Sequence, residues 1–289
     1  TSQPGISKQI RLLEEELGIQ IFIRSGKRVV SVSQPGKAVL EISERILRDV
    51  QNIKNIGSEF TDHDSGSLTI ATTHTQARYA LPKIVAEFVK NYPKVNLTIK
   101  QGSPSAIAQM VSSGEADLAI ITERIDDHPE LGKLPCYEWN HAVIVPHDHP
   151  LLDCRNPLSL EDLASFPLVT YEFAFNSGSS IARTFNKAHI EQPDVALSAA
   201  DTDVLKTYVR LGLGVGLMAK MAYDPVVDQD LQLIDAAHLF EPSPTWIALR
   251  TDTYLRGYAY DFIQMFAPKL TREAVDRILY TPVVEDFSI

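Results

Sequence analysis

From residue 68 onward, short apolar runs alternate with helical stretches, and this alternation limits the possible folds more than any other feature of the chain. Apolar runs at 68–72, 95–100 and 116–121 have the length of buried strands. Residues 76–91 and 104–113 have helical spacing and lie between them. Strands that alternate with helices require right-handed crossovers, so the pattern predicts a mostly parallel sheet covered by helices.

The alternation continues in a second segment, which begins with an apolar run at 137–145. We expect a strand at 168–171 and helices at 160–164, 181–188 and 203–211. The run 246–249 should return the chain to the first sheet, and 254–266 should close that sheet with a helix. The sequence therefore predicts an α/β body of two lobes with a cleft between them. The first lobe is about 66–140 and 245–289, and the second is about 141–244.

Polar side chains follow each predicted strand of the first lobe. Thr73, Thr75 and Gln76 follow the first strand, Ser103 the second and Thr122 the third. Ligands of open α/β sheets bind beyond the carboxyl ends of strands, next to helix N-termini. Lys and Arg are nearly absent there, so we expect neutral donors and helix dipoles to hold a small oxyanion.

The alternative interpretation is that each of these Thr and Ser residues only caps a helix. The same two interpretations apply to Thr202, which lies between Asp201 and Asp203 at the start of a predicted helix of the second lobe. If that helix begins at the cleft, Thr202 is a ligand candidate from the second lobe.

Charge is distributed unevenly along the chain. The net charge is -10 over 289 residues, yet residues 1–60 contain nine basic and seven acidic side chains. A basic head on an acidic body is typical of a nucleic-acid-binding module joined to another domain. The 22% of charged residues excludes a disordered chain, and no apolar run of 18 residues occurs. Two cysteines and no secretory leader favour the cytoplasm.

The basic head has the pattern of a helix followed by a hairpin. Apolar residues recur at helical spacing from Ile6 to Leu17, and Gly18 should end the helix. The opposite face carries residue types that bond base edges and phosphates, and the hairpin has three cations at its predicted tip. The expected DNA contacts are Ser2, Gln3, Pro4, Ser7, Lys8 and Arg11 on the helix and Arg24, Lys27 and Arg28 on the hairpin.

A long helix is expected from residue 34 to residue 59, between the head and the body. Its apolar residues recur at near-heptad spacing, at Val39, Ile42, Ile46, Val50, Ile53 and Ile56. Such a seam favours a dimerisation helix, and the alternative is a helix packed on its own domain. A polar hinge at 61–67 follows. We therefore divide the chain into a head (1–33), a linker helix with its hinge (34–62) and a ligand-binding body (63–289).

The run TSQPGISKQIRLLEEELGIQIFIRSGKRV at the start of the chain resembles the second half of the winged helix-turn-helix of LysR-type transcriptional regulators. The resemblance implies that the first helix of that domain and most of the second would precede Thr1, so this head is a partial winged helix-turn-helix. It also implies promoter DNA with a palindromic operator as a partner, bound through the intact N-terminal domain. Self-association to a dimer or tetramer follows, and RNA polymerase is a further candidate partner.

The body is similar to the CysB/Cbl-type branch of that family, which controls sulfur assimilation in bacteria. The resemblance rests on the runs GSLTIATTHTQARYALP, QGSPSAIAQ, GEADLAI and DTDVLKTYVRLGLGVGL. It implies a periplasmic-binding-protein-like effector domain that binds sulfate, thiosulfate, acetylserine or adenosine phosphosulfate. The implied contacts are residues matching Thr73, Thr75, Gln76 and Thr122, with Trp139 lining the cleft and Ser103 nearby. Asn176 stands where the branch has a Thr, and it can still donate to an anion.

Other motifs favour no catalytic role, and we expect no cofactor and no metal. Residues 212–216, GLGVG, follow a helix and precede a strand, the reverse of a dinucleotide site, and indicate a close-packing turn. His147 and His149 lack further ligands at a useful spacing, and Cys136 and Cys154 form no CxxC. A solute-binding protein for an oxyanion in a transport system is the rival interpretation. The missing leader and the DNA-binding run count against it, and no membrane association is expected.

Overall fold

A computed structural model of the chain describes residues 3–26, 28–122, 128–154, 157–176, 179–190 and 193–280, and of Gln3 only the backbone. Ser2 and Lys27 therefore lie outside the described residues. The chain divides into two compact units, Thr1–Thr61 and Asp62–Ile289, which are treated separately below. Within the described residues, we find no helix with the length and apolar character needed to cross a membrane.

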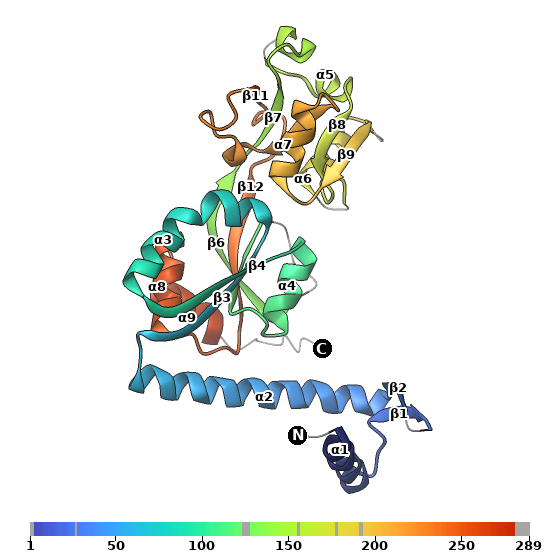
Figure 1. The fold of residues 1–289 in the computed structure, drawn as a ribbon, viewed down its shortest axis with the longest axis vertical. Coiled ribbons are helices and arrows are strands. Elements are labelled where there is room, and N and C mark those ends of the chain that lie inside the picture. The colour runs from blue at the N-terminus through green and yellow to red at the C-terminus, as the bar shows by residue number, and fades with distance from the viewer. Residues whose placement is uncertain are drawn as a thin grey trace, which may run out of the picture. The chain divides into compact units, whose positions relative to one another are not determined.

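The first unit is a helix, a hairpin and a long second helix (Figure 1). The elements are α1 (Gln3–Leu17), β1 (Phe22–Ser25), β2 (Arg28–Val32) and α2 (Gln34–Thr61). Helix α1 ends where Gly18 adopts a φ of 66°, which favours glycine. The Glu14 carboxylate accepts from the backbone N–H groups of Ile21 at 2.8 Å and Phe22 at 3.0 Å, which ties α1 to the hairpin.

Helix α2 begins against the hairpin. The Ser33 hydroxyl accepts from the backbone N–H of Gly36 at 2.9 Å and caps the helix. A Cβ on Gly36 would lie 2.1 Å from the carbonyl oxygen of Ile21, so only glycine fits there. The predicted apolar seam is exposed at five of its six positions within this chain, at Ile42, Ile46, Val50, Ile53 and Ile56.

The first lobe of the second unit is a five-stranded sheet in the order β4-β3-β5-β12-β6. The strands are β3 (Ser65–Thr72), β4 (Lys94–Gln101), β5 (Leu118–Ile121), β6 (Leu131–Trp139) and β12 (Ser243–Arg250). Helices α3 (Pro82–Asn91), α8 (Gly257–Phe266) and α9 (Arg272–Tyr280) cover one face, and α4 (Pro104–Ser112) covers the other (Figure 1). A short π-helix, η1 (Gln76–Ala80), precedes α3.

The second lobe has its own five-stranded sheet and its own core, in the order β11-β7-β10-β8-β9. The strands are β7 (His141–Pro146), β8 (Leu168–Tyr171), β9 (Val195–Ala199), β10 (Val215–Ala219) and β11 (Leu231–Asp235). The helical segments are η2 (Pro150–Asp153), α5 (Leu160–Ala164), α6 (Ser180–Lys187), α7 (Thr202–Arg210) and η3 (Lys220–Ala222). The chain crosses between the lobes at Asn140 and again between β11 and β12.

Two expectations about the body were wrong. Both sheets are mixed rather than mostly parallel, because β12 pairs antiparallel with β5 and β6, and β7 pairs antiparallel with β10 and β11. Residues 137–145 are not one apolar run of the second lobe, because 137–139 belong to β6 of the first lobe and 141–145 belong to β7 of the second. The interpretation of GLGVG as a close-packing turn is supported: a Cβ on Gly214 would lie 2.3 Å from the carbonyl oxygen of Pro167.

Candidate ligand site between the lobes

A small cavity of about 20 Å³ lies where the two lobes meet. Five of the predicted ligand residues line it, together with two aromatic side chains of the second lobe. The lining residues are Thr73, Thr75, Gln76, Thr122, Trp139, Tyr171 and Phe173. The first-lobe residues converge because β3 pairs in parallel with β5, so Thr73 and Thr122 leave the sheet at the same edge.

Three buried hydroxyl groups join the lobes beside this cavity. The Oγ1 of Thr75 lies 3.0 Å from the Oγ1 of Thr202 and 3.3 Å from the Tyr171 hydroxyl. The Tyr171 hydroxyl lies 2.9 Å from the Thr202 Oγ1 and accepts from the backbone N–H of Ala219 at 3.2 Å. Each hydroxyl can rotate, and Thr75 and Tyr171, which line the cavity, can redirect their protons to an anion there.

Gln76 is fixed by a bond within the first lobe. Its Oε1 accepts from the Tyr137 hydroxyl at 2.5 Å. The amide nitrogen is therefore the Gln76 atom that offers protons to other groups. Burial raises the pKa of Tyr137, so this hydroxyl stays protonated and remains a donor. Every polar group contributed to the small cavity is thus a neutral one.

A larger cavity of about 250 Å³ adjoins the small one and shares Thr122, Trp139, Tyr171 and Phe173 with it. Two buried nitrogens on its lining residues, Trp139 Nε1 and His141 Nδ1, have no hydrogen-bond partner among the described residues. Burial lowers the pKa of His141 to about 4, so the imidazole is neutral near pH 7. Unpartnered buried nitrogens are costly, and a bound ligand could supply their partners.

Charge in the larger cavity is balanced. Arg183 and Glu241 both line this cavity, and the Nη2 atom of Arg183 lies 3.5 Å from the Oε2 atom of Glu241. The other side chains there are aromatic, aliphatic, or hydroxyl-bearing like Ser179, Ser180 and Ser243. The cavities therefore suit a ligand recognised mainly by hydrogen bonds and apolar contact.

Three predicted ligand residues do not line either cavity. Ser103 caps α4, where its hydroxyl accepts from the backbone N–H of Ala106, as the alternative interpretation expected. Asn176 is exposed in the turn after β8. Thr202 contacts the site only through Thr75 and Tyr171, by hydrogen bonds between its hydroxyl group and theirs. Asp201, not Thr202, caps α7.

Tyr171, Phe173 and His141 were missed by the sequence analysis. Tyr171 is the last residue of a strand whose sequence is that of an ordinary buried strand. Its hydrogen-bond partners, Thr202 and Thr75, lie 31 and 96 residues away along the chain. A tyrosine at the carboxyl end of a buried strand was the available signal, because such positions face the cleft.

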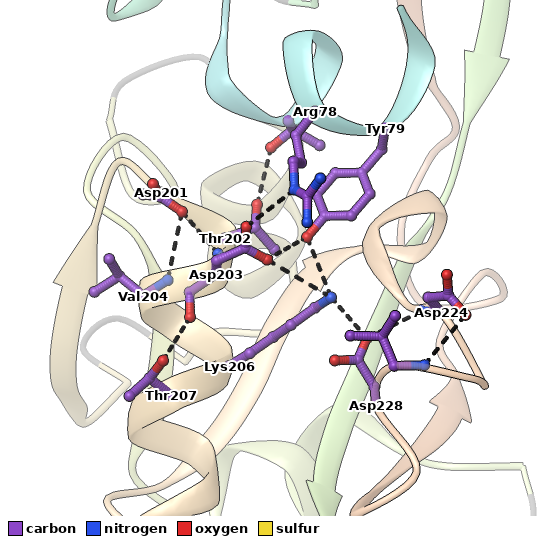
Figure 2. Close-up of polar contacts among 12 residues, drawn as sticks. Arg78, Tyr79, Asp201, Thr202, Asp203, Val204, Lys206, Thr207, Asp224 and Asp228 are labelled. Carbon is purple, nitrogen blue, oxygen red and sulfur yellow. Dashed lines mark hydrogen bonds and ion pairs between the residues drawn. The ribbon is translucent and has the colours of Figure 1, made fainter. Parts of the chain in front are cut away.

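A second set of contacts joins the lobes next to the hydroxyl groups (Figure 2). The Tyr79 hydroxyl donates to Asp203 Oδ1 at 2.5 Å, and Arg78 Nε lies 3.4 Å from Asp203 Oδ2. Lys206 Nζ donates to the Tyr79 hydroxyl at 3.2 Å and to Asp228 at 2.6 Å. The contacts of Arg78 and Tyr79 run between η1 and α7, whereas the contact between Lys206 and Asp228 lies within the second lobe.

The same region holds three groups that could in principle ligate a metal. Ligand atoms of His74, Asp201 and Asp203 lie within 4.8 Å of one another. His74 Nε2 already pairs with Asp201 at 3.2 Å, and Asp203 is engaged by Arg78 and Tyr79. Three engaged side chains are fewer than the four ligands of a structural zinc site, so we regard them as contacts between the lobes.

In the first unit, the described DNA-contact candidates occupy different settings. Pro4, Lys8 and Arg11 are exposed on α1, Ser7 is half-buried there, and Arg28 is exposed on β2. Arg24 instead points back to Glu14, 3.7 Å away, so it does not lie at the hairpin tip. The Phe22 and Ile21 amides and the Arg24 guanidinium hold the pKa of Glu14 below its ordinary value. Arg24 therefore helps to hold α1 on the hairpin.

Both units match described protein families. Residues 1–37 match the bacterial regulatory helix-turn-helix protein, lysR family, and residues 61–271 match the LysR substrate binding domain. The chain is 50% identical over 279 residues to the HTH-type transcriptional regulator SsuR of Burkholderia cenocepacia, covering 96% of this chain and 90% of that protein. The regulator CysB of the same organism is also 50% identical, covering 96% of this chain and 88% of that protein.

A solved structure agrees with these matches. The cofactor-binding domain of the Cbl transcriptional regulator superposes with a TM-score of 0.69 and 40% identity, covering 74% of this chain and 93% of that domain. The matched families and relatives are regulators rather than enzymes or transport proteins, so the solute-binding alternative has no support. The chain belongs to the LysR family of transcriptional regulators.

Proposed function

We propose that this regulator binds promoter DNA of sulfur-assimilation genes and that a small oxyanion held between its lobes sets its activity. The exposed cations on α1 and β2 supply the phosphate contacts, and the exposed seam of α2 pairs with a second copy to form a dimer or tetramer. RNA polymerase is the partner through which such a regulator would act on transcription.

One observation carries the effector proposal: the hydroxyl groups of Thr75, Tyr171 and Thr202 meet across the lobes beside a cavity lined by neutral donors. An oxyanion there would accept protons from both lobes at once. Its binding would depend on lobe spacing, which is the requirement for a ligand that shifts a conformational equilibrium. Relatives named CysB, SsuR and Cbl support sulfur metabolism as the setting.

The paired cavities favour an effector larger than a bare tetrahedral ion. The small cavity, at about 20 Å³, takes little more than one water-sized polar group. The adjoining 250 Å³ has aromatic walls and two unpartnered nitrogens. An oxyanion head at Thr75 with an organic body in the larger cavity uses both volumes. Acetylserine and adenosine phosphosulfate have that form, whereas sulfate and thiosulfate would fill the head position alone.

The test is a titration of the chain with sulfate, thiosulfate, O-acetylserine, N-acetylserine and adenosine phosphosulfate, followed by thermal unfolding. A ligand that binds only the folded state must raise the unfolding temperature. At least one compound should do so. Thr75→Val keeps the volume and removes the hydroxyl, so it should weaken that binding by about tenfold or more, the effect of one charge-assisted hydrogen bond.

Thr98→Val is the matched control, because Thr98 is a half-buried threonine of β4 in the same sheet and lines neither cavity. It should bind like the wild type. If no compound stabilises the chain, or if Thr75→Val responds like the wild type, the proposed site is wrong.

A further inference from the structure

We infer that Tyr79, Asp203, Lys206 and Asp228 form an interlobe latch, which fixes the lobes at the spacing where the Thr75, Tyr171 and Thr202 hydroxyl groups meet. The inference rests on the proposed function, because it assigns positioning residues to the same effector site. In this role, none of the four side chains touches the effector, yet together they set how tightly it binds.

The half of the latch in the second lobe is built independently of the first lobe. Lys206 and Asp228 are 3% and 1% exposed and form an ion pair of 2.6 Å. Asp228 also accepts from Arg210 at 2.8 Å and from the backbone N–H of Asp224 at 3.0 Å. Burial raises the pKa of Asp228, but these donors outweigh burial and lower it overall, so the carboxylate stays charged.

Tyr79, a half-buried side chain of η1, is the connection to the first lobe (Figure 2). Its hydroxyl lies between Asp203 and Lys206, donating to one and accepting from the other. Its ring centroid lies 5.0 Å from the Lys206 ammonium, and the ring packs against the core of the second lobe. The neighbouring pair of Arg78 and Asp203 also crosses the lobes, but its side chains are 60% and 46% exposed, and exposed pairs contribute little.

The latch and the effector site share their two supporting elements. Thr75 and Tyr79 are four residues apart at η1, and Thr202 and Lys206 are four residues apart on α7. Residues at this spacing lie on one face of a helix. The face of η1 that meets α7 therefore carries both contacts, so the spacing imposed by Tyr79 and Lys206 is the spacing at which Thr75 reaches Thr202.

This geometry has a consequence for affinity. An effector that needs donors from both lobes binds only the closed arrangement, and its apparent dissociation constant rises as the closed fraction falls. Removing the Tyr79 hydroxyl deletes the hydrogen bond that it donates to the Asp203 carboxylate and the one that it accepts from the Lys206 ammonium. A loss of that size lowers the ratio of closed to open chains by about tenfold, so the affinity falls by at most that factor.

The experiment compares the wild type, Tyr79→Phe and Tyr223→Phe. Tyr223→Phe is the matched control, because its hydroxyl donates to the Leu231 carbonyl at 3.1 Å entirely within the second lobe. Each chain carries spin labels at exposed Glu87 of the first lobe and exposed Asn186 of the second, with Cys136 and Cys154 replaced by alanine. Interlobe distances are measured by double electron–electron resonance, and affinity is measured by calorimetry with sulfate and N-acetylserine.

Tyr79→Phe should lengthen or broaden the interlobe distance distribution without ligand, weaken binding by up to about tenfold, and recover the wild-type distribution at saturating ligand. Tyr223→Phe should match the wild type in both measurements. An unchanged distance distribution in Tyr79→Phe overturns the latch, whatever the affinity. If the wild type binds neither compound, the proposed effectors are wrong, and the distance measurement alone decides the latch.

Discussion

At the scale of single residues, the site depends on side chains whose partners lie far away along the chain. Thr75 and Gln76 could be predicted because they follow a strand directly, and strand ends meet at the cleft. The contribution of Tyr171 could not be predicted, because it depends on two hydroxyl groups that come near only in the folded protein. The Tyr171 hydroxyl lies 3.3 Å from the Oγ1 of Thr75 and 2.9 Å from the Oγ1 of Thr202. Asn176 lines neither cavity, and its position in the motif does not reveal that the turn exposes it.

His141 supplies a prediction at this scale. Its side chain is 4% exposed, and burial lowers its pKa from 6.5 to about 4. Between these pH values the unfolded chain binds a proton that the folded chain excludes, so the free energy of unfolding falls as the pH is lowered from 6.5 toward 4. The size of this term is on the order of 3 kcal/mol.

Denaturant unfolding at several pH values checks this prediction. His141→Gln should lose that part of the pH dependence, whereas the same change at exposed His63 should keep it. If His141→Gln follows the wild-type profile between pH 6.5 and 4, the buried imidazole is not the group responsible.

At the scale of elements, strands and helices with an unbroken apolar pattern could be predicted from the sequence, whereas strands interrupted by glycine or proline could not. Strand β8 and helix α5 match the sequence prediction residue for residue, because each is bounded by clear signals. Strand β6 was missed because Gly132 and Pro135 interrupt it, and it pairs with β12 through an irregular register. Strand β10 begins within the GLGVG run, at Val215, where glycine is required by packing: a Cβ on Gly216 would lie 2.4 Å from the Ile144 side chain.

The junction between the hairpin and α2 gives a prediction about an element. Gly36→Ala places a Cβ against the backbone of Ile21, which cannot move away as a side chain tip could. The substitution should destabilise the first unit by about 2 kcal/mol. Gly57→Ala in the same helix meets nothing within 4 Å and should be neutral or stabilising by about 1 kcal/mol.

Hydrogen exchange of the α1 to β2 amides measures this difference. Exchange should quicken in Gly36→Ala and stay at the wild-type rate in Gly57→Ala. Equal protection in the two variants would show that α2 does not depend on close approach to Ile21.

At the scale of the whole molecule, the net charge of -10 combines two different surfaces. The first 60 residues carry more basic than acidic side chains, and the acidic balance belongs to the body. An acidic body does not attract free anions, and the small cavity is lined by neutral groups, so an oxyanion held there would be bound through oriented hydrogen-bond donors. The cavity lining fits this requirement, since Arg183 is paired with Glu241.

The proposal that an oxyanion binds between the lobes at Thr75 and Gln76 is tested most directly by locating a bound oxyanion in a crystal. Crystals of the full chain grown with selenate, a heavier analogue of sulfate, allow selenium to be located by anomalous scattering. The proposed site predicts a selenium peak between the lobes, with selenate oxygens within hydrogen-bond distance of Thr75 and of the Gln76 amide, and its loss in Thr75→Val. Selenate peaks confined to the outer surface, or an undiminished peak in Thr75→Val, would contradict it.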